Sequence, residues 1–127
     1  MKTVCLQFQP SRAPKISETN VSVLMLRIAL AEEAVQTFTV QRNRSNQDYV
    51  NYLFVGHAVG SIWNAVRLRA LRHRRFGAGL RRACIVTAEG SHGWQDYRLL
   101  HHFDSKQTLD KLSVPNKTLQ PTSRARR

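Results

Sequence analysis

Residues 49–66 read YVNYLFVGHAVGSIWNAV, and residues 67–82 follow directly as RLRALRHRRFGAGLRR. The first stretch is largely apolar and carries no charged side chain. The second carries seven arginines and no acidic residue. A polyanion or an anionic membrane surface should therefore meet the chain at such basic segments.

The apolar residues of the first stretch recur at the spacing of a helix face. Tyr52, Val55, Val59, Trp63 and Val66 fall on one stripe of a helical wheel. An acidic residue at position 48 can cap such a helix and complement its dipole, and the glycines at 77 and 79 can end it. The sequence therefore predicts a small single α+β domain dominated by one long helix at about 48–75.

The predicted domain covers residues 21–112. A dense apolar run followed by Glu32 and Glu33 favours a helix over 21–36, with a strand over 21–28 as the alternative, because dense runs lose their period. Composition indicates short strands and turn-rich connections in the rest of the domain. These are strands over 37–40 and 83–87, a loop over 41–47, a turn over 89–93, and either a strand or a short helix over 94–103.

Both ends are predicted to lie outside this domain. Pro10 and Pro14 restrict the residues before them to extended conformations, so residues 1–20 are expected to form an extended N-terminal segment. Pro115 and Pro121 interrupt a polar, basic ending, which predicts a disordered tail over 113–127. The expected termini are therefore disordered around one folded unit.

The tail reads PNKTLQPTSRARR over residues 115–127. It resembles the C-terminal tails of hypothetical proteins encoded on mobile integron gene cassettes, where reading through the recombination site yields Asn-Lys-x-Leu-Gln-Pro-Thr. The resemblance implies a bacterial accessory gene. It transfers no activity, because cassette products have unrelated folds, and it leaves open the alternative of an unselected reading frame.

The net charge of +12 is concentrated in two segments: residues 67–82 carry +7 and residues 117–127 carry +4. Arginine outnumbers lysine 15 to 5, and the forked guanidinium group suits phosphate. We therefore expect nonspecific nucleic-acid binding as the best-supported function. The expected binding residues are Arg67, Arg69, Arg72, Arg74, Arg75, Arg81 and Arg82. No known recognition motif accompanies them and they scatter around the wheel, so a merely solvated basic segment is the alternative.

The uncharged stretch supports a second hypothesis. Eighteen residues without charge, followed by arginines, have the length and flank of a single membrane span with the arginines on the cytoplasmic side. Asn51, His57 and Asn64 are costly in hydrocarbon, which favours a buried core helix. No secretion signal is present, so we expect a cytoplasmic protein with reduced thiols, and the inner membrane is the alternative.

No pattern in the sequence indicates catalysis, a cofactor or a metal. His92, His101, His102 and Asp104 lack zinc-site spacing, and the two adjacent histidines should point to opposite sides of a strand. Cys84 is interpreted as a small buried strand residue. Nucleotide-binding and hydrolase motifs are missing. The sequence predicts a protein that is not an enzyme, and it leaves open the oligomeric state and the choice between DNA and RNA.

Overall fold

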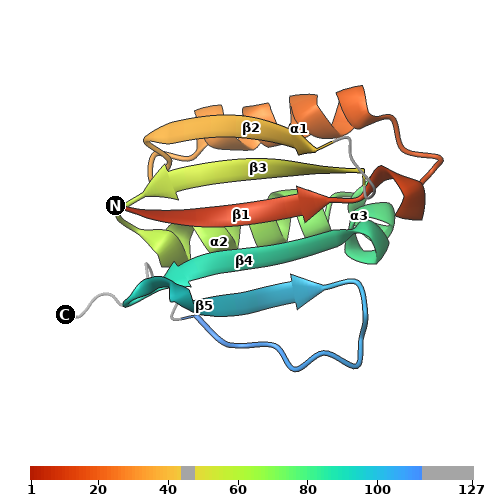
Figure 1. The fold of residues 1–127 in the computed structure, drawn as a ribbon. Helices are drawn as coiled ribbons and strands as arrows, with labels where there is room; N and C mark the ends of the chain where they lie inside the picture. Colours follow the sequence, from red (N-terminus) through yellow and green to blue (C-terminus); the bar gives the residue numbers. More distant parts are fainter. Residues whose placement is uncertain (44–47, 113–127) are drawn as a thin grey trace.

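The computed structural model describes residues 1–43 and 48–112 (Figure 1). They form a five-stranded antiparallel sheet with the order β2-β3-β1-β4-β5 and short helices. The elements in chain order are β1 (Lys2–Phe8), η1 (Pro10–Arg12), α1 (Glu18–Ala31), β2 (Thr37–Asn43), β3 (Tyr49–Gly56), α2 (Val59–Val66), η2 (Arg67–Leu71), α3 (Gly77–Ala83), β4 (Cys84–Gly90) and β5 (Gly93–His102).

The two helical connections interlock. β1 lies in the middle of the sheet, antiparallel to both β3 and β4. α1 connects β1 to β2 across β3, and the α2–α3 segment connects β3 to β4 across β1. This is the split β-α-β arrangement, and here β5 extends it by a hairpin on β4.

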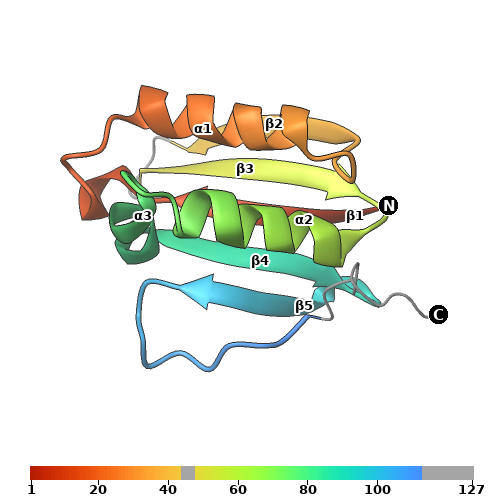
Figure 2. The same cartoon turned by 180° about the vertical axis from the view of Figure 1, so that it is seen from behind.

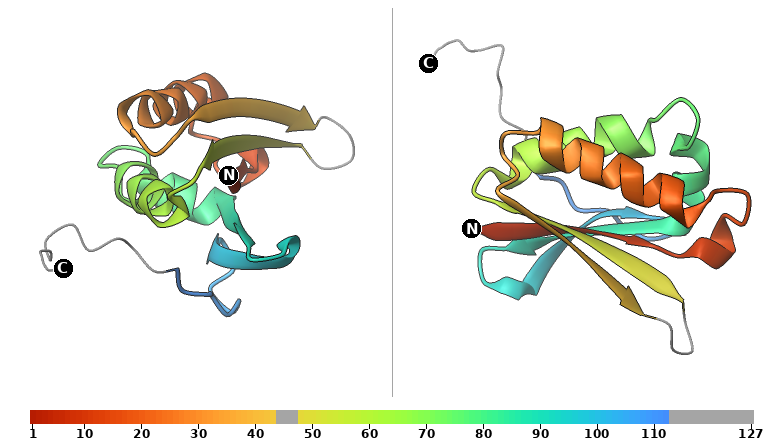
Figure 3. Two further views of the ribbon diagram at one scale, coloured as in Figure 1. Left: turned by 90° about the vertical axis from the view of Figure 1, so that its left-hand side faces the viewer. Right: turned by 90° about the horizontal axis from the view of Figure 1, so that it is seen from above.

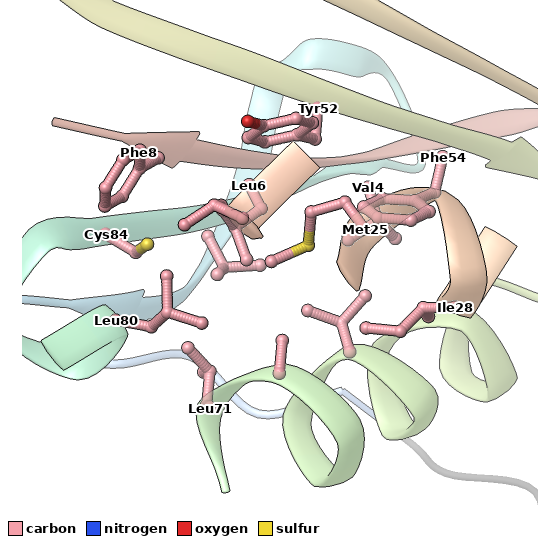
Figure 4. Close-up of a cluster of buried hydrophobic side chains, with 14 of the residues drawn as sticks. Val4, Leu6, Phe8, Met25, Ile28, Tyr52, Phe54, Leu71, Leu80 and Cys84 are labelled. Carbon is pink, nitrogen blue, oxygen red and sulfur yellow. The ribbon is translucent and has the colours of Figure 1, made fainter. Parts of the chain in front are cut away.

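The helices all cover one face of the sheet, as Figure 2 and the left view of Figure 3 show. Alternation along β1 directs Val4, Leu6 and Phe8 toward this helix layer, where each is fully buried. Figure 4 shows them packed against Met25 of α1 and residues of the α2–α3 segment. The opposite face of the sheet has no described element over it.

The predicted helix over 48–75 is wrong. Residues 49–56 form β3, in which Val50, Tyr52 and Phe54 are buried and alternate with half-buried residues. A helix begins only at Val59 and the helical segment ends at Leu71. The longest helix in the described part of the chain is α1, with 14 residues. The domain is α+β as predicted, but no long helix dominates it.

The error has a physical cause. Both faces of β3 carry apolar residues, so the period-2 alternation is hidden inside a continuous apolar run that also fits a helix. Pairing decides between them, because β3 lies between β1 and β2 and is hydrogen-bonded on both sides. Asp48 does not cap a helix; its carboxylate lies 3.5 Å from the Arg42 guanidinium.

The structure confirms several of the other predicted helices and strands. α1 confirms a helix over most of 21–36, excludes the strand alternative, and begins after Ser17, whose hydroxyl accepts from the Asn20 N–H at 3.4 Å. The two short strands are present as β2 and β4, and β5 resolves 94–103 as a strand. β2 also continues to Asn43, into the segment expected as a loop.

The expected N-terminal segment, residues 1–20, contains β1, which is the central strand. The predicted basic tail over 113–127 and residues 44–47 of the predicted loop lie outside the described residues. Residues 49–66, considered above as a membrane span, comprise β3 and α2. Within the described ranges, no helix has the length and apolar character needed to cross a membrane.

Candidate functional site

The helix that carries the first arginines changes its winding at Arg67. Residues 59–66 are α-helical, and residues 67–71 form a π-helical turn, η2. A π turn holds an extra residue, which rotates everything after it by about 100° relative to an α-helical wheel. Arg69 and Arg72, three residues apart, lie on the same side of such a wheel, and both line one groove in the structure.

The chain then reverses in a tightly held turn over residues 72–76. The ring Nδ1 of His73 accepts from the backbone N–H groups of Arg75 and Phe76, each at 3.1 Å. The Arg81 guanidinium donates to the carbonyl of Leu71 and so caps the end of η2. A Cβ on Gly77 would lie 2.8 Å from that same carbonyl oxygen, so the close approach requires glycine. The turn places Arg74 at the same hollow as Arg69 and Arg72.

A groove of about 540 Å³ lies between α1 and the η2 turn. An adjoining hollow of about 230 Å³ shares Leu24, Arg27 and His73 with it. We call the two together the α1–η2 groove. Its apolar lining consists of Val23, Leu24, Ile28, Ala31, Leu68 and Phe76, and its cationic lining consists of Arg27, Arg69, Arg72, Arg74 and Arg75.

No carboxylate neutralises these arginines within the described structure. All eight acidic residues fall in the described ranges, and the ion pairs found there are Arg42 with Glu18, Arg42 with Asp48, and His92 with Asp96. The guanidinium of Arg75 lies 5.2 Å from the centre of the Phe76 ring. The groove therefore concentrates positive charge that a bound anion would stabilise.

The seven predicted arginines separate into two groups. Arg69, Arg72, Arg74 and Arg75 line the groove. The other three do not line it. Arg67 donates to the Asn64 side-chain oxygen at 2.7 Å, Arg81 caps Leu71, and Arg82 is exposed on α3.

Arg27 lines both hollows, and sequence reasoning missed it. It lies 40 residues before Arg67 on a different helix, outside the arginine-rich segment at residues 67–82. The only local indication is its helical spacing with Leu24 and Ala31, which also line the groove. That spacing places the three on one side of α1 without indicating what faces them.

The uncovered face of the sheet holds a second pair of hollows, of about 410 Å³ and about 360 Å³, that share Thr87 and Trp94. Its lining is mostly neutral, and includes Cys5, Asn51 and Leu53. The Asn51 side-chain oxygen is buried and has no hydrogen-bond partner among the described residues. This face therefore contrasts in charge with the α1–η2 groove.

Among the described residues, nucleophilic and metal-binding side chains do not cluster at the α1–η2 groove or at the hollows on the uncovered face. Burial raises the pKa of the Cys5 thiol to about 11 and raises that of Cys84 further, which disfavours the reactive thiolate. His101 and His102 lie on opposite faces of β5, as strand alternation predicts: His101 contacts the Arg81 carbonyl at 2.9 Å, and His102 lines a hollow on the uncovered face. No cluster of metal-binding side chains occurs within residues 1–43 and 48–112.

Comparisons with protein-family models, with curated proteins and with solved structures give no match for this chain. The tail that resembles cassette-encoded proteins lies outside the described residues, so that resemblance remains a prediction. The chemistry of the α1–η2 groove is therefore the basis for a functional proposal.

Proposed function

We propose that this protein binds nucleic acid nonspecifically through the α1–η2 groove. The observation that carries the proposal is that five arginines from α1, η2 and the following turn line one groove and have no carboxylate partner among the described residues. Guanidinium groups form forked, charge-assisted hydrogen bonds to phosphate oxygens. A polyanion is therefore the partner that this charge distribution favours.

The same geometry supports nonspecific binding. Sequence readout of a duplex needs an element that projects into a base-pair groove, whereas these arginines surround a recess. Contacts to phosphate position a protein on nucleic acid but carry no base information. Affinity should therefore depend strongly on salt and weakly on sequence.

The test compares two triple variants that remove the same charge. Arg69, Arg72 and Arg74 are replaced by Gln in one variant, and the exposed, distant Arg98, Lys106 and Lys111 are replaced by Gln in the other. Fluorescence polarisation with a labelled oligonucleotide at about 50 to 200 mM salt gives affinity and salt slope. We expect the groove variant to lose up to about 0.9 from the duplex slope for each contact removed, and the matched variant to keep the wild-type slope.

Binding that survives in the groove variant, or that weakens equally in both variants, would rule out the groove as the interface. A prior amide NMR spectrum checks folding, because the alternative of an unselected reading frame predicts collapsed, undispersed peaks. Well-dispersed peaks in each variant would assign any lost affinity to lost contacts.

A further inference from the structure

The α1–η2 groove carries more than charge. Between its arginines it exposes apolar side chains, of which Leu68 is 43% exposed. Phosphate gains nothing from such surface, because burying apolar area stabilises only an apolar or planar partner. A ligand that uses the whole groove must therefore be anionic along one part and apolar along another.

The smaller hollow also offers ring surfaces. The rings of His73 and Phe76 are stacked, with centroids 5.0 Å apart and planes 19° from parallel. Both residues line that hollow together with Arg75 and Asn20. Aromatic faces and guanidinium planes are the surfaces on which unpaired bases stack, and an amide can hydrogen-bond a base edge.

We infer that the groove binds single-stranded nucleic acid, with arginines on the phosphates and bases against the apolar and ring surfaces. The inference rests on the proposed function and narrows its substrate class. A duplex can bring phosphates to the arginines, but it keeps its bases stacked inside and cannot place them against the apolar and ring surfaces of the recess. A single strand can turn its bases into the groove while its phosphates remain at the arginines.

The experiment measures binding of one labelled sequence as a single strand, as a duplex and as an abasic strand of the same length and charge, at one salt concentration. The wild-type protein should bind the single strand about tenfold more tightly than either of the other two, since stacking of even one base gives about that factor. The abasic strand tests the bases without altering the protein.

Matched protein variants test the groove lining. Leu68→Gln changes a groove residue that is already 43% exposed, and Leu30→Gln changes a leucine on α1 that is 79% exposed and does not line the groove. Leu68→Gln should lower single-strand affinity about tenfold and leave duplex affinity and salt slope unchanged. Leu30→Gln should change none of these values.

The outcomes separate the inference from the proposed function. Equal binding of single strand, duplex and abasic strand, with no effect of Leu68→Gln, would overturn the inference and leave phosphate binding intact. Binding of none of the three would overturn both.

Vesicles of phosphatidylcholine and phosphatidylglycerol provide a further arm of the experiment. Vesicle binding that both leucine variants weaken and that the single strand does not displace would overturn the inference in favour of a membrane surface.

Discussion

The helix layer and the uncovered sheet face of this protein carry opposite kinds of surface. The α1–η2 groove gathers five arginines, whereas the central strands β1, β3 and β4 carry only Lys2 and Glu89 as charged residues, both at strand ends. Neighbouring side chains on a sheet face lie about 4.5–5.5 Å apart, so like charges there would repel strongly. A chain with a net charge of +12 can place its cations on helices and turns at lower cost.

The contrast separates the origin of stability from the origin of binding. The strands bury alternate residues against the helices and so hold the groove-forming elements in place. The groove residues themselves contribute charge and exposed apolar surface. Changes on the buried face of the sheet should therefore affect folding most, and changes in the groove should affect ligand affinity.

The largest expected effect tests the two sides of the sheet with equivalent residues. Leu6 on β1 is fully buried under the helices, and Leu53 on the adjacent strand β3 is half-buried on the uncovered face. Leu6→Ala should lower the free energy of unfolding by about 3–5 kcal/mol, and Leu53→Ala by about 1 kcal/mol. Urea denaturation measures both. A loss at Leu53 as large as that at Leu6 would indicate that something covers this face in solution.

The two cysteines test the same difference between the uncovered face of the sheet and the face packed against the helices. Cys5 lies on the uncovered face with a pKa of about 11, which leaves on the order of 1 thiolate in 10,000 at neutral pH. Cys84 is fully buried toward the helix layer. A thiol reagent should label Cys5 slowly, about 100-fold below a free thiol of ordinary pKa, and Cys84 only after denaturation. Mass spectrometry follows both. Labelling of Cys84 in the native protein would contradict a tightly packed helix layer.

A smaller effect concerns the bond between the two layers. The hydroxyl groups of Tyr52 on β3 and Ser22 on α1 are 2.7 Å apart. Tyr52→Phe should cost about 1 kcal/mol, because the buried ring stays while the hydrogen bond is lost and Ser22 loses its partner. Tyr97→Phe, on an exposed tyrosine of β5, is the matched control and should leave unfolding unchanged. Equal losses in the free energy of unfolding for the two variants would show that the Tyr52–Ser22 hydrogen bond does not contribute to stability.

The smallest effect is a dependence on pH at His101. Burial lowers the pKa of this side chain below its ordinary value. The unfolded chain then takes up the proton more readily, so stability should fall as the pH drops below about 6.5. Thermal unfolding at several pH values checks this, with His101→Gln as the control, because glutamine keeps a donor for the Arg81 carbonyl. An identical pH dependence in the variant would assign the titration to another group.

Local residue preferences predicted part of this fold correctly. The helix over most of 21–36 and the strands at 37–40 and 83–87 are present, because each segment's own composition and spacing favour that structure. The sequence also predicted where the basic surface lies, because the position of charged residues along the chain can be read without knowing the fold. Four of the seven predicted arginines line the groove that the structure forms.

What the sequence by itself determined is therefore the chemistry: a cationic, arginine-rich segment beside an apolar one, in an α+β chain. Tertiary structure alone decided that residues 49–56 are a strand and that Lys2–Phe8 is the central one, because β1 pairs with residues more than 40 positions away. It also decided that Arg27 joins the later arginines, since α1 packs beside η2. Local periodicity contains no information about such distant partners, and pairing and burial select among conformations that the local sequence favours almost equally.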